Sequence, residues 1–263
     1  MDLRPMSKLA RLVPPEIIAL CCAVLLWDAT TVYLALPAVV LPRPGAVISE
    51  LINNPTLYLI HAASTLENTL AAFALSVVFG VALAVGIVYS KLLEKTVYAL
   101  LVALNNVPKV ALAPLFVIWL GTGSGSKIGM AFLISIFAIV IDAVLGLRSL
   151  DPDYVDLGRS MRGSGLKMLI KFRFPNALPS IFAGMKVAMS LSIVGAIVGE
   201  FVAAQKGLGF VIMSSQGIFR TDRVFAAIIV LAAMGTVLYY AVEYAERRLL
   251  PWHASHRALR TGA

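Results

Sequence analysis

The chain has 263 residues, 60% of them apolar and 14% charged, with a formal net charge of +8 at pH 7. Soluble domains are less than half apolar and contain about 25% charged residues, so this composition excludes an ordinary soluble domain and indicates a membrane protein. Basic residues retained on the inner side of a membrane account for the positive charge, and no nucleic-acid partner is expected.

Six apolar segments approach the ~20 residues that a helix needs to cross a bilayer. They predict an all-α membrane protein with one domain, residues 1–263, and spans at roughly 17–36, 66–90, 97–120, 127–148, 176–203 and 224–246. The first run, from Ile17, is longer than the core of a signal peptide and lacks a convincing cleavage site. We therefore expect it to remain as a span.

Two polar segments predict structure outside the spans. Residues 41–61 are too polar to cross a membrane and begin Leu-Pro-Arg-Pro-Gly, which favours a short amphipathic helix along the outer face. Residues 201–223 form the last outer loop, where Gly207 and Gly209 allow a turn and a re-entrant segment.

The distribution of basic residues predicts the orientation. With the N-terminus inside, most of the 22 lysine and arginine residues are cytoplasmic. Those outside are then Arg43, Lys127, Lys206, Arg220 and Arg223. Because cytoplasmic loops carry the excess of Lys and Arg, both chain ends are predicted to be cytoplasmic.

Polar residues within the spans are candidates for a translocation path, because each charge there costs about 2.5–3.5 kcal/mol to insert. The candidates are Asn105, Asn106, Lys109, Asp142, Lys186 and Glu200. Pro108 lacks a backbone donor, so the third span is predicted to kink next to this cluster, and broken helices often contact substrate. The same side chains would also suit bonds between neighbouring helices, and the sequence leaves both interpretations open.

No catalytic or metal site is expected. The glycines of residues 121–125 lack the lysine and the spacing of a phosphate-binding loop, and no nucleophile elbow or zinc-protease motif occurs. The three histidines form no metal-binding pattern with carboxylates, and the adjacent Cys21 and Cys22 are expected to act as small apolar residues. We therefore expect no enzyme activity and no cofactor on this chain.

The polar loop from Asp151 to Pro175 lies between two long apolar segments and predicts a short docking helix. Asp151 is suited to cap a helix through its side-chain oxygen, and Pro152 suits the first helical position because no donor is needed there. Gly163 and Gly165 are suited to end this helix about three turns later.

The predicted docking helix has an apolar stripe and a basic end. Tyr154, Leu157 and Met161 would lie along one face, and Arg159 and Arg162 would lie near the helix C-terminus, where the dipole favours cations. A capped helix of this kind, held between two spans, is a plausible surface for docking another protein.

The loop also carries a recognisable pattern. Residues 156–158 read Asp-Leu-Gly, and residues 172–175 read Phe-Arg-Phe-Pro. This resembles the cytoplasmic motif of the permease subunits of binding-protein-dependent ABC importers, in the group that serves nitrate, sulfonates, taurine and pyrimidine-type vitamin precursors. The family has Glu-Ala-Ala, three residues, Gly, nine residues and Ile-x-Leu-Pro. Here the spacing and the final proline are kept, but Arg162 stands at the glycine position with Gly163 beside it.

The resemblance covers nearly the whole chain, from Leu41 to Trp252. Other matching segments are Val107-Pro108, Ala113-Pro114-Leu115, Asp151-Pro152, Gly199-Glu200 and Gly207-Leu208-Gly209. It implies a homodimer of six-span subunits in the cell membrane, surrounded by lipid. It further implies an ATPase partner that binds ATP and Mg, and an extracytoplasmic binding protein that delivers a small polar solute.

On this resemblance, the residues that couple the permease to its ATPase are Tyr154, Asp156, Leu157, Gly158, Met161, Arg162, Gly163 and Pro175. The alternative function is a secondary transporter or channel that uses an ion gradient through Asp142, Glu200 or Lys109. Transport driven by an ion gradient, with no ATPase bound, would distinguish it.

Overall fold

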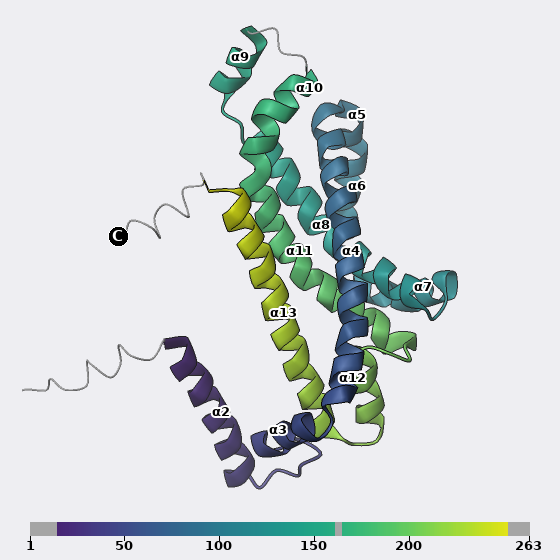
Figure 1. The fold of residues 1–263 in the computed structure, drawn as a ribbon. Coiled ribbons are helices and arrows are strands. Elements are labelled where there is room, and N and C mark those ends of the chain that lie inside the picture. The colour runs from purple at the N-terminus through teal and green to yellow at the C-terminus, as the bar shows by residue number, and fades with distance from the viewer. Residues whose placement is uncertain (1–14, 161–164, 252–263) are drawn as a thin grey trace, which may run out of the picture.

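The computed structural model describes residues 15–160 and 165–251, and in these ranges the chain forms helices and connections without strands (Figure 1). In chain order the helices are α2 (Pro15–Tyr33), α3 (Pro44–Asn53), α4 (Pro55–Tyr89), α5 (Lys91–Leu93), η1 (Glu94–Tyr98), α6 (Ala99–Asn105), η2 (Lys109–Leu112), α7 (Ala113–Leu120), α8 (Ser124–Arg148), α9 (Pro152–Ser160), α10 (Gly165–Met168), η3 (Leu169–Arg173), α11 (Phe174–Ala203), α12 (Leu208–Gly217) and α13 (Thr221–Leu249). The predicted all-α class is confirmed for the described residues.

Four long apolar helices form the bundle. Within the described ranges, the helices long enough to cross a membrane are α4, α8, the run Gly165–Val202 that contains α11, and α13. α4 begins at Pro55 rather than near residue 66, and Pro55 occupies the first turn, where a helix needs no backbone donor. Further along α4, Thr65 and Asn68 are 0% and 2% exposed, so these polar side chains are buried against protein.

The tightest packing in the bundle is between α8 and α11. A Cβ atom on Gly195 would lie 2.5 Å from Ala131 Cα, and one on Gly146 would lie 2.7 Å from Ser180 Cβ. Small residues at such crossings let two helix backbones approach closely, which is how helices associate where lipid removes the hydrophobic driving force. α11 also contacts α4 and α13, so it lies at the centre of the fold.

The third predicted span is broken. The segment Lys91–Asn105 and the segment Lys109–Leu120 meet at 93°, and α7 points sideways from the bundle (Figure 1). Pro108 supplies no backbone donor at the break, which agrees with the predicted kink. The backbone bends far more sharply than a kinked helix.

The first two helices lie at one end of the bundle. α2 stands apart from the long helices (Figure 1) and is tied to the rest through Trp27, whose Nε1 donates to the Pro42 carbonyl at 3.0 Å. Its apolar part, Ile17–Tyr33, is shorter than the ~20 residues of a full span. The amphipathic helix predicted within residues 41–61 is confirmed as α3, which packs against α13.

The two ends of the bundle carry different short helices (Figure 1). α9, α10 and η3 join α8 to α11 at one end, which we call the α9 end. α3 and α12 lie at the opposite end, the α12 end. α12 is the helical segment of the loop predicted for residues 201–223, and it contacts α4, α11 and α13.

Candidate functional site

The short helix α9 projects beyond the rest of the bundle at the α9 end (Figure 1). Its predicted cap is confirmed, because the Asp153 N–H donates to Asp151 Oδ1 at 3.0 Å. The Tyr154 N–H donates to the Asp151 carbonyl at 3.1 Å, which starts the first turn. Asp151 thus satisfies backbone donors that a helix start leaves unpaired. Asp153 adds negative charge in the first turn, where the helix dipole favours it.

The predicted docking residues of α9 are placed as follows. The Tyr154 side chain is 54% exposed, and Asp156 is exposed. Leu157 and Gly158 belong to α9, whereas Met161, Arg162 and Gly163 lie outside the described residues. A single helix with an exposed tyrosine is therefore available to a partner.

Gly165 does not end the docking helix as predicted, but begins α10. The Tyr89 hydroxyl at the end of α4 donates to the Gly165 carbonyl at 3.0 Å, and the Arg173 guanidinium lies 5.7 Å from the centre of the Tyr89 ring. Tyr89 thus ties the returning chain to the bundle.

Side-chain contacts also close the base of the loop. Asn176 Nδ2 on α11 donates to Ser149 Oγ, just after α8, at 3.0 Å. Pro175, the last residue of the predicted motif, lies in the first turn of α11, directly after the π-helical turn η3. α9 is therefore carried on α8 and α11, the most closely packed helices of the fold.

An open cavity of about 280 Å³ lies beside this loop. It is lined by Val85, Tyr89, Gly165, Leu166 and Leu169, so its walls come from the end of α4 and from α10 and η3. Leu166 is 65% exposed. This apolar surface lies at the same end of the bundle as α9.

Lys109, a predicted path residue, stabilises the break in the third span. Its ammonium donates to the Asn105 carbonyl at 3.1 Å and to Asn105 Oδ1 at 2.8 Å. It also lies 4.6 Å from the centre of the Phe137 ring, close enough for a cation–π contact. Asn105 and Asn106 are both exposed on the single chain.

Lys186 is paired with a residue that the sequence analysis did not single out. Its ammonium lies 2.8 Å from Glu246 Oε2, which links α11 to α13. Lys186 also lines an open cavity of about 450 Å³, with Ala183, Val187, Ser190, Leu191 and Tyr239. Asp142 is half-buried on α8 beside Gly184, whose Cβ would lie 2.8 Å from Asp142 Cβ. Arg148, at the end of α8, pairs with Glu94 at 2.9 Å.

Glu200 is almost fully buried, with 1% of its surface exposed. Its carboxylate lies under the start of α12, where it accepts hydrogen bonds from the Thr65 hydroxyl and the Gly209 N–H. The six predicted path residues therefore do not gather in one place. Lys186 lines a cavity, Lys109 and the asparagines mark the break, and Glu200 lies within the α12 end.

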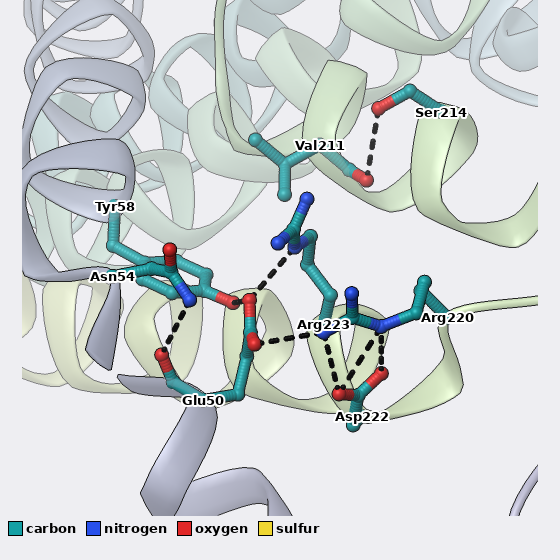
Figure 2. A network of polar contacts seen from close by, with 8 residues as sticks. All are labelled: Glu50, Asn54, Tyr58, Val211, Ser214, Arg220, Asp222 and Arg223. Atoms are coloured by element: carbon teal, nitrogen blue, oxygen red, sulfur yellow. Dashed lines mark hydrogen bonds and ion pairs between the residues drawn. The ribbon is translucent and has the colours of Figure 1, made fainter. Parts of the chain in front are cut away.

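Figure 2 shows a polar network that the sequence analysis missed. Glu50 on α3 is 6% exposed, and its carboxylate binds Arg220 Nη2 at 2.9 Å and Arg223 Nε at 2.7 Å. The Tyr58 hydroxyl of α4 also donates to Glu50, at 3.4 Å. The hydrogen bonds from Arg220 to Asp222 raise the pKa of the Arg220 guanidinium, so it stays charged. The network fastens α3 to α4 and to the start of α13.

No group of three or more His, Cys, Asp or Glu side chains in residues 15–160 and 165–251 is arranged to hold a metal ion. Cys21 and Cys22 are exposed, free thiols on α2. The described residues thus present an exposed, capped helix at one end and polar networks at the other.

Comparison with known proteins gives consistent matches. Residues 76–251 match the family described as "Binding-protein-dependent transport system inner membrane component". The chain is 32% identical over 228 residues to the formylaminopyrimidine transport permease protein ThiX of Halalkalibacterium halodurans, covering 86% of this chain and 91% of that one. It is 31% identical over 232 residues to the riboflavin transport system permease protein RibX of Chloroflexus aurantiacus, covering 87% and 86%. Among solved structures, an inward-facing form of the MetNI methionine ABC transporter shares the fold, with a TM-score of 0.64 and 15% identity over 74% of this chain and 98% of that one.

Proposed function

Because this chain belongs to the family of binding-protein-dependent transport system inner membrane components, we propose that α9 is the element through which a separate ATPase subunit drives this permease. The observation that carries the proposal is the position of α9, a capped and exposed helix held beyond the bundle between two long apolar helices. Such a helix fits a groove on a partner, which is a common mode of helix recognition.

The base of α9 explains how a movement of the partner would reach the membrane. α8 and α11 flank the docking loop, and the Asn176–Ser149 hydrogen bond joins their ends. Because the backbones of α8 and α11 touch at Gly195 and Gly146, the pair is suited to move as one body. Closure of the ATPase would then tilt both helices together and open the path to the other side, as in rigid-body switching.

The other partners follow from the orientation that we propose. The α9 end is cytoplasmic and the α12 end is extracytoplasmic, which follows from the excess of basic residues expected on the cytoplasmic side. A binding protein then delivers solute to the α12 end, and a second copy of the chain completes the path. ATP and Mg bind to the ATPase rather than to this chain.

The solute is proposed to be small and polar. ThiX and RibX are named for the transport of formylaminopyrimidine and riboflavin, and a taurine permease of Escherichia coli is 30% identical to this chain over 235 residues. A sulfonate, nitrate or vitamin precursor fits this range. The binding protein would make the finer choice.

The test is a pull-down of the tagged chain from its native membrane, with ATP-driven uptake measured in vesicles. We expect a nucleotide-binding subunit to co-purify and to be lost when Tyr154, Leu157 and Met161 are all changed to Asp. The Tyr154→Phe variant is the matched control, because it keeps the exposed ring. A chain that purifies alone and moves solute down an ion gradient would overturn the proposal.

A further inference from the structure

The start of α12 is held by side chains of other helices. Three consecutive backbone N–H groups donate to three different side chains: Gly207 to His61 Nδ1 at 3.1 Å, Leu208 to Thr65 Oγ1 at 2.8 Å, and Gly209 to Glu200 Oε2 at 2.8 Å. The acceptors come from α4 and α11, so the contacts join residues more than 140 positions apart for His61 and Thr65.

This arrangement replaces an ordinary helix cap. The first N–H groups of a helix have no partner within it, and a side chain at the N-cap position commonly accepts one of them. The N-cap residue of α12 is Gly207, which has no side chain. The cap is therefore supplied by α4 and α11, and these hydrogen bonds hold the start of α12 only while the two helices stay in register with it.

The glycines of this turn are required by the closeness of Glu200. Gly207 has a φ of +117°, and a Cβ atom there would lie 2.2 Å from Glu200 Cδ. A Cβ on Gly209 would lie 2.8 Å from Glu200 Cβ. The turn thus passes directly over the carboxylate, and Glu200 is 1% exposed beneath it.

Thr65 is the centre of the arrangement. Its hydroxyl lies 2.9 Å and 3.0 Å from the two oxygens of Glu200 and accepts the Leu208 N–H. A hydroxyl has one proton, which it donates to the carboxylate, and two lone pairs, one of which receives the backbone N–H. Valine has the same shape but neither function.

His61 adds a dependence on protonation. Its Nδ1 accepts the Gly207 N–H, so this nitrogen carries no proton in the structure. An imidazolium has two donors and no acceptor, so protonation removes the bond and sets two donors facing each other. The charged groups around it are Lys206 on the turn and Glu200 beyond Thr65, and the Phe210 ring lies 5.8 Å away.

We propose that His61, Thr65 and Glu200 are positioning residues that hold α12 at the solute entrance, and that protonation of His61 releases its start. That α12 borders the entrance rests on the proposed function, which makes the α12 end extracytoplasmic. The attachment of α12 by these three side chains rests on the observed contacts alone. Since only neutral His61 can make its bond, the docked form is stable while His61 is neutral and weakens as the pH falls and His61 gains a proton.

Two neighbouring serines of α12 provide a reporter and its matched control. Ser215 is 2% exposed, whereas Ser214 is exposed. We would introduce Ser215→Cys or Ser214→Cys into the full chain, after changing Cys21 and Cys22 to Ser, and measure the rate of maleimide labelling in membranes. The ratio of the two rates cancels the effect of pH on thiol reactivity and reports how often α12 leaves its place.

We expect Thr65→Val to raise this ratio about tenfold at pH 7.5, because two hydrogen bonds are lost, while Thr65→Ser leaves it near the starting value. In the otherwise unchanged chain, the ratio should rise about fivefold between pH 7.5 and 5.5. His61→Asn offers an amide oxygen as acceptor and does not titrate, so its ratio should stay flat.

An unchanged labelling ratio in Thr65→Val would contradict the proposal that these side chains hold the start of α12. A pH response that persists in His61→Asn would contradict the role of the imidazole. The His61→Asn comparison remains informative if Thr65→Val fails to fold. Labelling needs no ATPase, so it tests this inference even where uptake proves to be independent of ATP. Failure of the proposed function would appear in the pull-down and not in the labelling ratio.

Discussion

The Lys186 ammonium lies 2.8 Å from the Glu246 carboxylate, so an ion pair joins α11 to α13 within the apolar bundle. The Glu246 side chain is 9% exposed and that of Lys186 is 22% exposed. Charges in such surroundings persist when they are paired, because an isolated charge is costly to keep out of water. The pair also borders the open cavity that Lys186 lines, so a solute in that cavity would meet a lysine already neutralised by a carboxylate.

Replacing one residue of this ion pair should reduce the stability of the folded chain more than replacing both. Lys186→Met leaves Glu246 buried without its cation, and we expect a loss of about 3 kcal/mol, at the lower end of the range for a broken buried pair. The double variant Lys186→Met with Glu246→Gln should recover most of this loss. Thermal unfolding of the purified chain, followed by size-exclusion chromatography, measures both. A double variant as unstable as Lys186→Met would show that the pair is not the cause.

In the Glu50 network, replacing Glu50 should destabilise the chain more than replacing Asp222 (Figure 2). Glu50→Gln weakens the contacts of both arginines, whereas Asp222→Asn leaves Arg220 bound to Glu50. We expect Glu50→Gln to destabilise the chain by about 2–3 kcal/mol and Asp222→Asn by less than about 1 kcal/mol. Limited proteolysis between α2 and α3 measures release of α3, and equal cleavage of the two variants would argue against the ranking.

Patterns among neighbouring residues predicted helices and the bend in the third span. Contacts between residues far apart in the sequence could not be predicted. The polarity of residues 41–61 and their Leu-Pro-Arg-Pro-Gly start predicted the helix α3, and Pro108 predicted a kink where the break lies, because each signal is local. The arginine partners of Glu50 lie 170 and 173 positions away, so no local pattern could reveal them. The one available signal was an acidic residue in a helix otherwise suited to an apolar surface.

The same limit applied to the polar residues of the spans. Glu200 was predicted to be a costly charge within a span, but its partner Thr65 lies 135 positions away and looks like an ordinary residue of a helix start. Residues 41–61 were predicted to form one short amphipathic helix outside the spans, whereas the structure ends α3 at Asn53 and begins α4 at Pro55. The sequence does not say which of these polar side chains face protein. The capped helix start at Asp151 and Pro152 was predicted correctly, since these residues act within one turn.

Close helix packing predicts the effect of adding one methyl group. Gly195→Ala places a Cβ 2.5 Å from Ala131 Cα, so α8 and α11 must separate. We expect a loss of about 2–3 kcal/mol, as for overpacking elsewhere. Gly45→Ala in α3 is the control, because nothing lies within 4 Å of its Cβ position, and it should be neutral or slightly stabilising. Thermal unfolding of both variants measures this difference. Equal stability of Gly195→Ala and Gly45→Ala would show that the close approach of α8 and α11 does not require a glycine.

Lys109 predicts a link between the broken span and transport. Because α6 ends at Asn105, the carbonyl of that residue lacks a helical partner, and the Lys109 ammonium takes the place of the missing donor. Such a carbonyl is tolerated at membrane depth only when it is satisfied. Lys109→Met should therefore lower stability by about 2 kcal/mol and change the uptake kinetics, while binding of the ATPase at α9 is retained. Lys109→Arg keeps the donor and the contact with Phe137, and should preserve both properties. Uptake assays with parallel pull-downs measure these effects, and unchanged kinetics in Lys109→Met and Asn106→Leu would leave these side chains with a structural role only.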